Sequence, residues 1–142
     1  YKTNMGASIS KGGKKIQCAG YYFHLEPNNA FIAGGLYIPA ADMLQKVRQE
    51  IDYNFDEFKK IISDKKFVAT FNALEQTDKL SRPPKGYDDT NEAIEFLKLK
   101  SFIVSTPVTN EIILSKDFSK KLVAHFEIMK PLMDFLNRAI EE

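Results

Sequence analysis

The most distinctive group of residues that could do chemistry is the stretch Arg82-Pro83-Pro84-Lys85-Gly86-Tyr87-Asp88. Its two prolines stiffen the backbone and bias it away from helix. A stiff backbone presents its donor groups at a low cost in conformational entropy. Guanidinium and ammonium groups are well suited to a phosphate or a carboxylate. We therefore treat this stretch, with a lysine that follows one short predicted helix later, as a candidate anion site made of Arg82, Lys85, Tyr87 and Lys100.

The alternative is a rigid surface connection whose charges neutralise one another. From Lys79 to Lys100 the chain has five cations and four acids, which leaves a net charge of only +1. The acids that would supply the partners are Asp88, Asp89, Glu92 and Glu95.

The first twenty residues are also basic, because four lysines precede the first acid, Glu26. The segment Lys11–Lys14 contains two adjacent glycines and is typical of a turn. It can be a phosphate-binding loop, a basic arm that contacts nucleic acid, or a solvated hairpin tip, but it lacks the spacing of a P-loop. We predict that cations from this stretch and from the proline-rich stretch converge on one cleft, namely Lys2, Arg82, Lys85 and Lys100.

A second candidate is a polar row on a predicted strand, formed by Tyr22, His24 and Glu26. These residues alternate with apolar neighbours, so they share one face of the strand. A histidine between a tyrosine and a glutamate can hold a neutral ligand or act as an oriented general base. A solvated polar sheet face is the alternative. The other histidine, His125, lies beside an apolar helical stripe and is interpreted as a boundary residue of that helix.

Composition excludes several classes of protein. The 142 residues are 44% hydrophobic, enough for the core of one domain. The single cysteine, Cys18, cannot form an internal disulfide. No apolar run reaches the roughly 18–20 residues of a membrane helix, so we expect no membrane association. The single free cysteine and the lack of a recognisable targeting segment predict a cytoplasmic location. Neither the histidines nor the cysteine have metal-ligand spacing, so no metal or other cofactor is expected.

The pattern of apolar residues predicts one α+β domain over residues 1–142. A hairpin over 21–38 and a strand near 101–106 would form an antiparallel or mixed sheet. Two amphipathic helices, about 41–62 and 116–140, would pack on it, because their apolar residues recur at gaps of three and four. Gly34-Gly35 inside a strand suggests a bulge or a close approach by another backbone or a ligand.

Six segments of the chain together match the pattern of a known family: Tyr1–Asn4, Gly20–Pro27, Gly34–Pro39, Arg48–Ile51, Arg82–Asp88 and Leu97–Phe102. In these segments the chain resembles an uncharacterised, largely bacterial family catalogued as domain of unknown function 2461. The resemblance covers nearly the whole chain and implies no function. Members of that family are longer and carry an Arg- and Asp-rich motif that ends in Asp-Lys-x-x-Tyr. The resemblance therefore implies that this chain is the C-terminal part of a longer domain, with a further N-terminal segment packing near Tyr1.

The family more often has His-Pro where this chain has Thr90 to Glu92, which argues against a histidine-dependent role there. Three hypotheses follow from the sequence. The first is an anion-binding module or enzyme that acts on a phosphorylated small molecule or nucleic acid. The second is a non-catalytic protein-interaction domain, and the third is a hydrolase that uses His24 and Glu26. Oligomeric state is not predicted.

Overall fold

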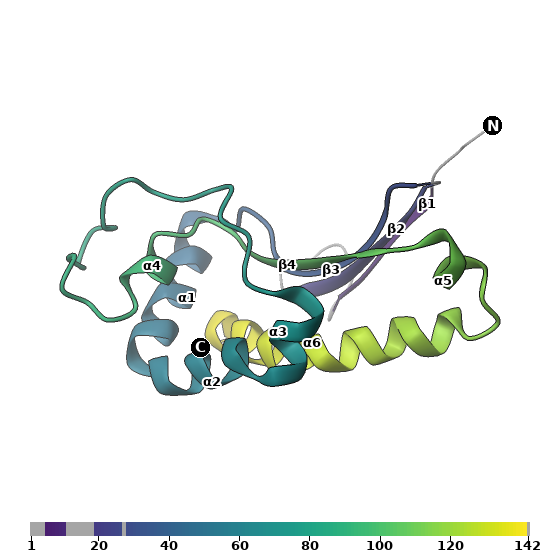
Figure 1. Cartoon of the computed structure of the whole chain (residues 1–142). Coiled ribbons are helices and arrows are strands. Elements are labelled where there is room, and N and C mark those ends of the chain that lie inside the picture. Colours follow the sequence, from purple (N-terminus) through teal and green to yellow (C-terminus); the bar gives the residue numbers. More distant parts are fainter. Residues whose placement is uncertain (1–4, 11–18, 27, 142) are drawn as a thin grey trace.

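The computed structural model describes residues 5–10, 19–26 and 28–141, with side chains from Ala19 onward. The sheet has four antiparallel strands in the order β1-β2-β3-β4 (Figure 1). The predicted hairpin and the strand near 101–106 are confirmed, and the sheet is antiparallel rather than mixed. The strands are β1 (Met5–Ser10), β2 (Gly20–Leu25), β3 (Ala30–Leu36) and β4 (Phe102–Val108).

Strand β1 was not expected, since the first twenty residues read as a polar, basic loop. It pairs along its whole length with β2, from Met5 opposite Leu25 to Ser10 opposite Gly20. Its sequence, Met-Gly-Ala-Ser-Ile-Ser, is rich in small residues with low strand propensity. Pairing with a neighbouring strand therefore overrides local preference here. The Lys11–Lys14 turn and Lys2 lie outside the described residues.

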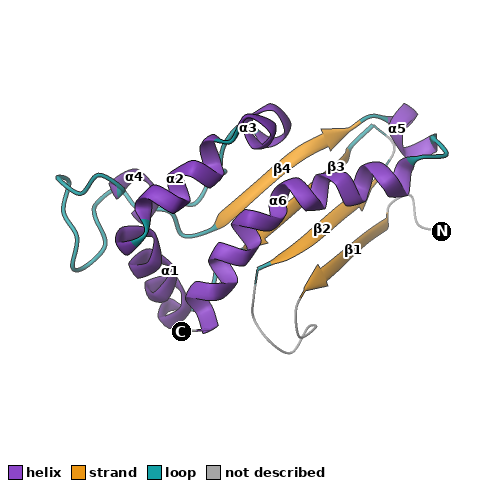
Figure 2. Ribbon diagram, turned by 90° about the horizontal axis from the view of Figure 1, so that it is seen from below, coloured by secondary structure: helices purple, strands orange, loops and turns teal. Residues whose placement is uncertain are grey.

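The principal helices lie on one side of the sheet, and α6 runs along its face (Figure 2). The predicted helix over 41–62 is two helices, because the chain breaks at Asn54 (φ −120°, ψ 42°). Within the described residues, no helix has the length and apolarity that crossing a membrane requires. The helices are α1 (Ala41–Tyr53), α2 (Phe55–Ser63), α3 (Lys65–Phe71), α4 (Ile94–Leu97), α5 (Asn110–Leu114) and α6 (Phe118–Glu141).

The core lies between α6 and one face of the sheet. The alternation in β2 is confirmed: the ring of Tyr21 lies 4.7 Å from that of Phe126 on α6, so this set of residues faces the helix. Phe58 of α2 is fully buried between other aromatic rings, with its ring centre 5.3 Å from that of Phe135. Burying a side chain of this size contributes about 1.5–3 kcal/mol. The predicted apolar stripe of α6 therefore packs against the sheet, whereas the stripe of α1 and α2 packs mainly against α6 and the neighbouring helices α3 and α4.

The glycine pair in β3 marks two close approaches. A Cβ atom on Gly34 would lie 2.1 Å from Sδ of Met129 on α6. Gly35 has φ +130°, and a Cβ atom there would lie 1.8 Å from the carbonyl oxygen of Phe102 on the neighbouring strand. The expectation of a close backbone approach is confirmed at Gly35, and at Gly34 the approaching group is a core methionine.

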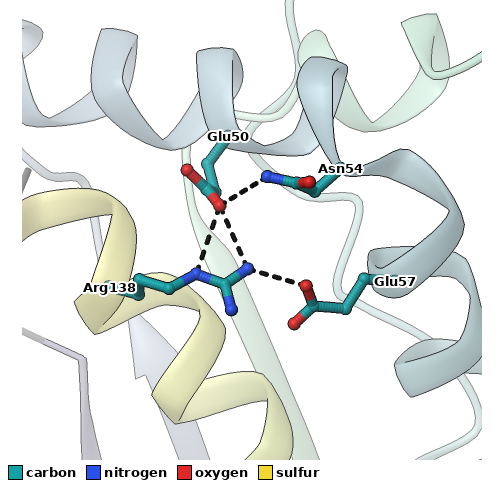
Figure 3. A network of polar contacts seen from close by, with 4 residues as sticks. All are labelled: Glu50, Asn54, Glu57 and Arg138. Atoms are coloured by element: carbon teal, nitrogen blue, oxygen red, sulfur yellow. Dashed lines mark hydrogen bonds and ion pairs between the residues drawn. The ribbon is translucent and has the colours of Figure 1, made fainter.

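A polar network joins α1, α2 and α6 (Figure 3). The carboxylate of Glu50 is buried and accepts hydrogen bonds from Asn54 Nδ2 at 2.8 Å and from Arg138 Nη2 at 3.0 Å. Arg138 Nη2 also donates to Glu57 Oε1 at 2.8 Å. A buried carboxylate without partners would be strongly destabilising. This network therefore holds α1, on which the candidate site depends, against the long helix α6.

Candidate functional site

The candidate anion residues lie on a loop of residues 79–100, between α3 and β4, which we call the 79–100 loop. Backbone hydrogen bonds close its base: Leu80 N–H donates to the Lys98 oxygen and Lys100 N–H to the Asp78 oxygen, both at 2.8 Å. Lys79 and Leu99 form an isolated bridge between these two bonds. Figure 1 shows that the loop projects beyond one end of the sheet. Its base is therefore fixed while its far side is presented outward.

A tight turn presents Lys85 at the outer part of this loop. The Tyr87 N–H donates to the carbonyl of Pro84 at 3.1 Å, which closes a four-residue turn. Gly86 occupies the third position with φ +94°, a conformation that favours glycine. Pro84 is buried and Lys85 is exposed. The sequence predicted that the prolines and glycine would present a donor group on a stiff backbone. In the structure this group is Lys85, exposed on a tight turn.

Arg48 on α1 anchors the inner end of the loop. Its Nε donates to the carbonyl oxygen of Leu97 at 2.7 Å and its Nη2 to that of Leu99 at 3.2 Å. These carbonyls belong to the last residue of α4 and to the second residue after it, so they have no partner within so short a helix. Burial lowers the pKa of Arg48. The guanidinium group therefore donates its hydrogen bonds to the backbone of the loop and not to a ligand.

Tyr87 belongs partly to the core. Its ring is half-buried and packs against the hydrophobic cluster. Burial is the main reason that its pKa is raised, and the nearby Asp52 carboxylate adds to the effect. The hydroxyl therefore stays protonated at neutral pH and can donate a hydrogen bond. Tyr87 anchors the turn and is at most a secondary ligand.

The acids of the loop pair with two particular lysines. Lys79 pairs with Glu95, and Nζ of Lys98 lies 3.6 Å from Oδ1 of Asp89. The hydrogen bond from Lys79 lowers the pKa of Glu95. Both lysine side chains are largely covered, with 27% and 15% of their surface exposed. Ion pairing therefore involves the lysines at the base of the loop.

The carboxylate of Asp88 is also engaged, because it accepts from the backbone N–H of Thr90 at 3.0 Å and from its hydroxyl. These hydrogen bonds lower the pKa of Asp88. Thr90 therefore turns toward Asp88 and does not cap a helix, since α4 begins later, after Ala93.

Three candidate cations remain: Arg82, Lys85 and Lys100. All are exposed, and among the described residues none of their side chains makes an ion pair or a hydrogen bond. Glu92, the fourth acid of the loop, is exposed and likewise unpaired within that part of the chain. Lys2 lies outside the described residues, so the convergence of all four cations on one cleft stays a prediction.

The polar row of β2 forms a second, separate group. Nε2 of His24 lies 3.1 Å from Oε2 of Glu26, which also accepts from Asn29 Nδ2 at 3.0 Å. The imidazole stacks on Phe31 with ring centres 5.2 Å apart, and Nδ1 lies 3.5 Å from the Tyr22 hydroxyl. The row faces away from α6, because the alternating residue Tyr21 packs against that helix. The three predicted residues therefore do share one face.

In a neutral His24, the hydrogen bond to an ionised Glu26 places the ring proton on Nε2, because a carboxylate only accepts hydrogen bonds. Nδ1 is then left as an acceptor, the arrangement of a general base. The hydrogen bond from His24 lowers the pKa of Glu26. No group of three metal-ligating side chains occurs among the described residues.

His125 is a boundary residue, as expected. It is half-buried on α6, its Nδ1 lies 2.6 Å from the Lys121 carbonyl, and its ring meets Phe71 edge-on.

The fold and its loop define an α+β domain in which a single antiparallel sheet carries a cationic, proline-stiffened loop at one end. The chain belongs to the family described as Conserved hypothetical protein (DUF2461), whose model matches residues 1–135. The family resemblance noted in the sequence is thereby confirmed. Neither the curated proteins nor the solved structures give a match.

Proposed function

We propose that this protein binds a phosphate-bearing anion through Arg82, Lys85 and Lys100 on the 79–100 loop. The observation that supports it is the division of charge within the loop. Three of its four acids are engaged, with Lys79, Lys98 and the Thr90 backbone, and Glu92 is exposed. The three exposed cations have no acidic partner among the described residues. An incoming anion would therefore not have to displace an existing ion pair.

The expected affinity for a simple ligand is low. Ion pairs at exposed positions contribute about 0.2–1 kcal/mol each, so three of them correspond at best to a dissociation constant in the millimolar range. A ligand with several phosphates would gain by contacting more than one cation at once. The stiff turn at Lys85 reduces the entropy lost in holding such contacts. A cytoplasmic location stays a prediction that rests on the single cysteine.

Calorimetric titration with inorganic pyrophosphate tests the proposal. The test variant replaces Arg82, Lys85 and Lys100 together with glutamine, which removes three positive charges. A matched control removes three charges from exposed lysines of the α2–α3 region, by replacing Lys60, Lys65 and Lys66 with glutamine.

We expect the loop variant to lose pyrophosphate binding and the control to keep most of it. Equal losses in both variants would mean that only net charge attracts the anion. Absence of binding by the unmodified protein would refute the proposal and favour the non-catalytic interaction domain.

A further inference from the structure

An exposed tyrosine stands at the same end of the sheet as the loop. Tyr37 and Ile38 connect β3 to α1 and have 69% and 53% of their surface exposed. Leu36, the last residue of β3, pairs with Phe102, the first residue of β4. Tyr37 therefore follows the end of β3, and the connection from β3 to α1 lies at the end of the sheet where the 79–100 loop joins β4 (Figure 1).

The backbone at this connection is held in a strained conformation. Ile38 has φ +38°, which is unfavourable for a β-branched residue. Its N–H donates to Oγ of Ser101 at 2.7 Å, and Ser101 is itself buried. Strain of this kind persists only where the surroundings compensate for it, and it is often found at functional sites. The contact fixes Tyr37 in an outward position.

The same contact brings Tyr37 close to a cation of the loop. Ser101 directly follows Lys100, so Tyr37 and Lys100 are each one residue away from the hydrogen bond that joins their segments. Tyr37 has an exposed ring, and Lys100 has an exposed ammonium group without an acid partner among the described residues. An exposed aromatic ring and an exposed, unpaired positive charge therefore stand on two segments that this hydrogen bond joins, each one residue away from it.

From this juxtaposition we infer that the anion is a phosphate ester that carries an aromatic base, namely a nucleotide or a single strand of nucleic acid. The base stacks on Tyr37, and the phosphates contact Lys100 and the other cations of the loop. Every base has a face that can stack, whereas a duplex keeps those faces covered. Stacking of one base strengthens binding about five- to 150-fold. This inference rests on the proposed function.

Two labelled strands of equal length and phosphate number separate stacking from charge: a thymidylate decamer and its abasic counterpart. Their affinities would be measured by fluorescence anisotropy at fixed salt, since phosphate contacts depend on ionic strength. We expect the protein to bind the thymidylate strand at least about fivefold more tightly than the abasic strand. Thymidine monophosphate as a competitor distinguishes a mononucleotide site from a strand-binding one.

Three tyrosine variants locate the effect. Tyr37→Ala should abolish the preference for the base-bearing strand, and Tyr37→Phe should keep it, because stacking needs the ring and not the hydroxyl. Tyr53→Ala is the matched control, since Tyr53 on α1 is similarly exposed at 73%, and it should behave like the unmodified protein. Both positions are exposed, so these variants are expected to fold.

Equal binding of the two strands by the unmodified protein would overturn the inference. So would a preference that survives in Tyr37→Ala. In either case, the proposed anion site would still be supported if the protein binds the abasic strand and the variant without the three loop cations does not. Failure of both strands and of pyrophosphate to bind would refute the two proposals together.

Discussion

Replacing Arg48 with methionine should release the 79–100 loop from helix α1. The change removes two hydrogen bonds, from Nε to the Leu97 oxygen and from Nη2 to the Leu99 oxygen. Both acceptor residues are fully buried, so their carbonyls would lose a charged donor in a place that water reaches poorly. A hydrogen bond to a charged group contributes about 1.5–3 kcal/mol. Because two bonds from one side chain are not additive, we expect a total loss of about 2–4 kcal/mol.

Urea denaturation followed by circular dichroism measures this loss, and hydrogen exchange localises it. Leu80 and Lys100, whose amides close the base of the loop, should exchange faster in the variant than in the unmodified protein. Lys46→Met is the matched control, because Lys46 lies on the same helix but is exposed and reaches the Ile140 oxygen only at 3.4 Å. A surface change of this kind should cost at most about 0.5 kcal/mol.

Arg48→Lys adds a graded test, since one ammonium cannot reproduce the fork of a guanidinium. It should recover only part of the lost stability. The reasoning would be refuted if Arg48→Met cost no more than Lys46→Met. Unchanged amide exchange at the base of the loop would refute it as well.

Three further predictions concern the framework around the sites. Gly34→Ala should destabilise the fold by about 1–3 kcal/mol in thermal or urea unfolding, because its new methyl group meets a core methionine. Arg138→Met should lower the free energy of unfolding by about 3–5 kcal/mol in the same measurements, because the buried carboxylate of Glu50 loses its charged partner. Glu57→Gln, at the exposed pair, should lower it by under about 1 kcal/mol. The depressed pKa of Glu26 stabilises the fold above the ordinary carboxyl range, and this contribution is lost as pH falls through the lowered value. His24→Ala should therefore flatten the acid side of a plot of stability against pH, and an unchanged slope would contradict the proposed hydrogen bond.

Much of the fold could be predicted because the apolar residues of its strands and helices recur at regular spacings. The alternation of apolar and polar residues after Gly20 identified the hairpin, and the apolar stripe ending at Ile62 identified helical packing. The break at Asn54 was missed because the stripe continues across it in phase. Strand β1 was missed because its small residues carry little strand propensity, and only pairing with β2 makes it a strand.

The site was predicted less completely, because its energetics depend on contacts between distant residues. The stiffness of the loop follows from Pro83 and Pro84, but the choice of Glu95 as the partner of Lys79 depends on how the loop closes. The role of Arg48 required knowing that α1 passes beneath α4. The one sequence signal for Arg48 was its place in the segment Arg48–Ile51, which carries the family resemblance.

The conformation of Tyr37 and Ile38, between β3 and α1, could not have been predicted from local rules. A positive φ is disfavoured for an isoleucine, so sequence reasoning assigns Ile38 to an extended conformation. Only the hydrogen bond to Ser101, a residue far along the chain, reveals the conformation it adopts.

Backbone amide shifts recorded during a titration with pyrophosphate would show directly where an anion binds. We predict that the largest changes fall on the amides of Arg82, Lys85, Gly86 and Lys100, with little change at the exposed Lys59 and Lys60 of α2. Changes centred on α2, or spread evenly over all exposed lysines, would contradict an anion site on the 79–100 loop.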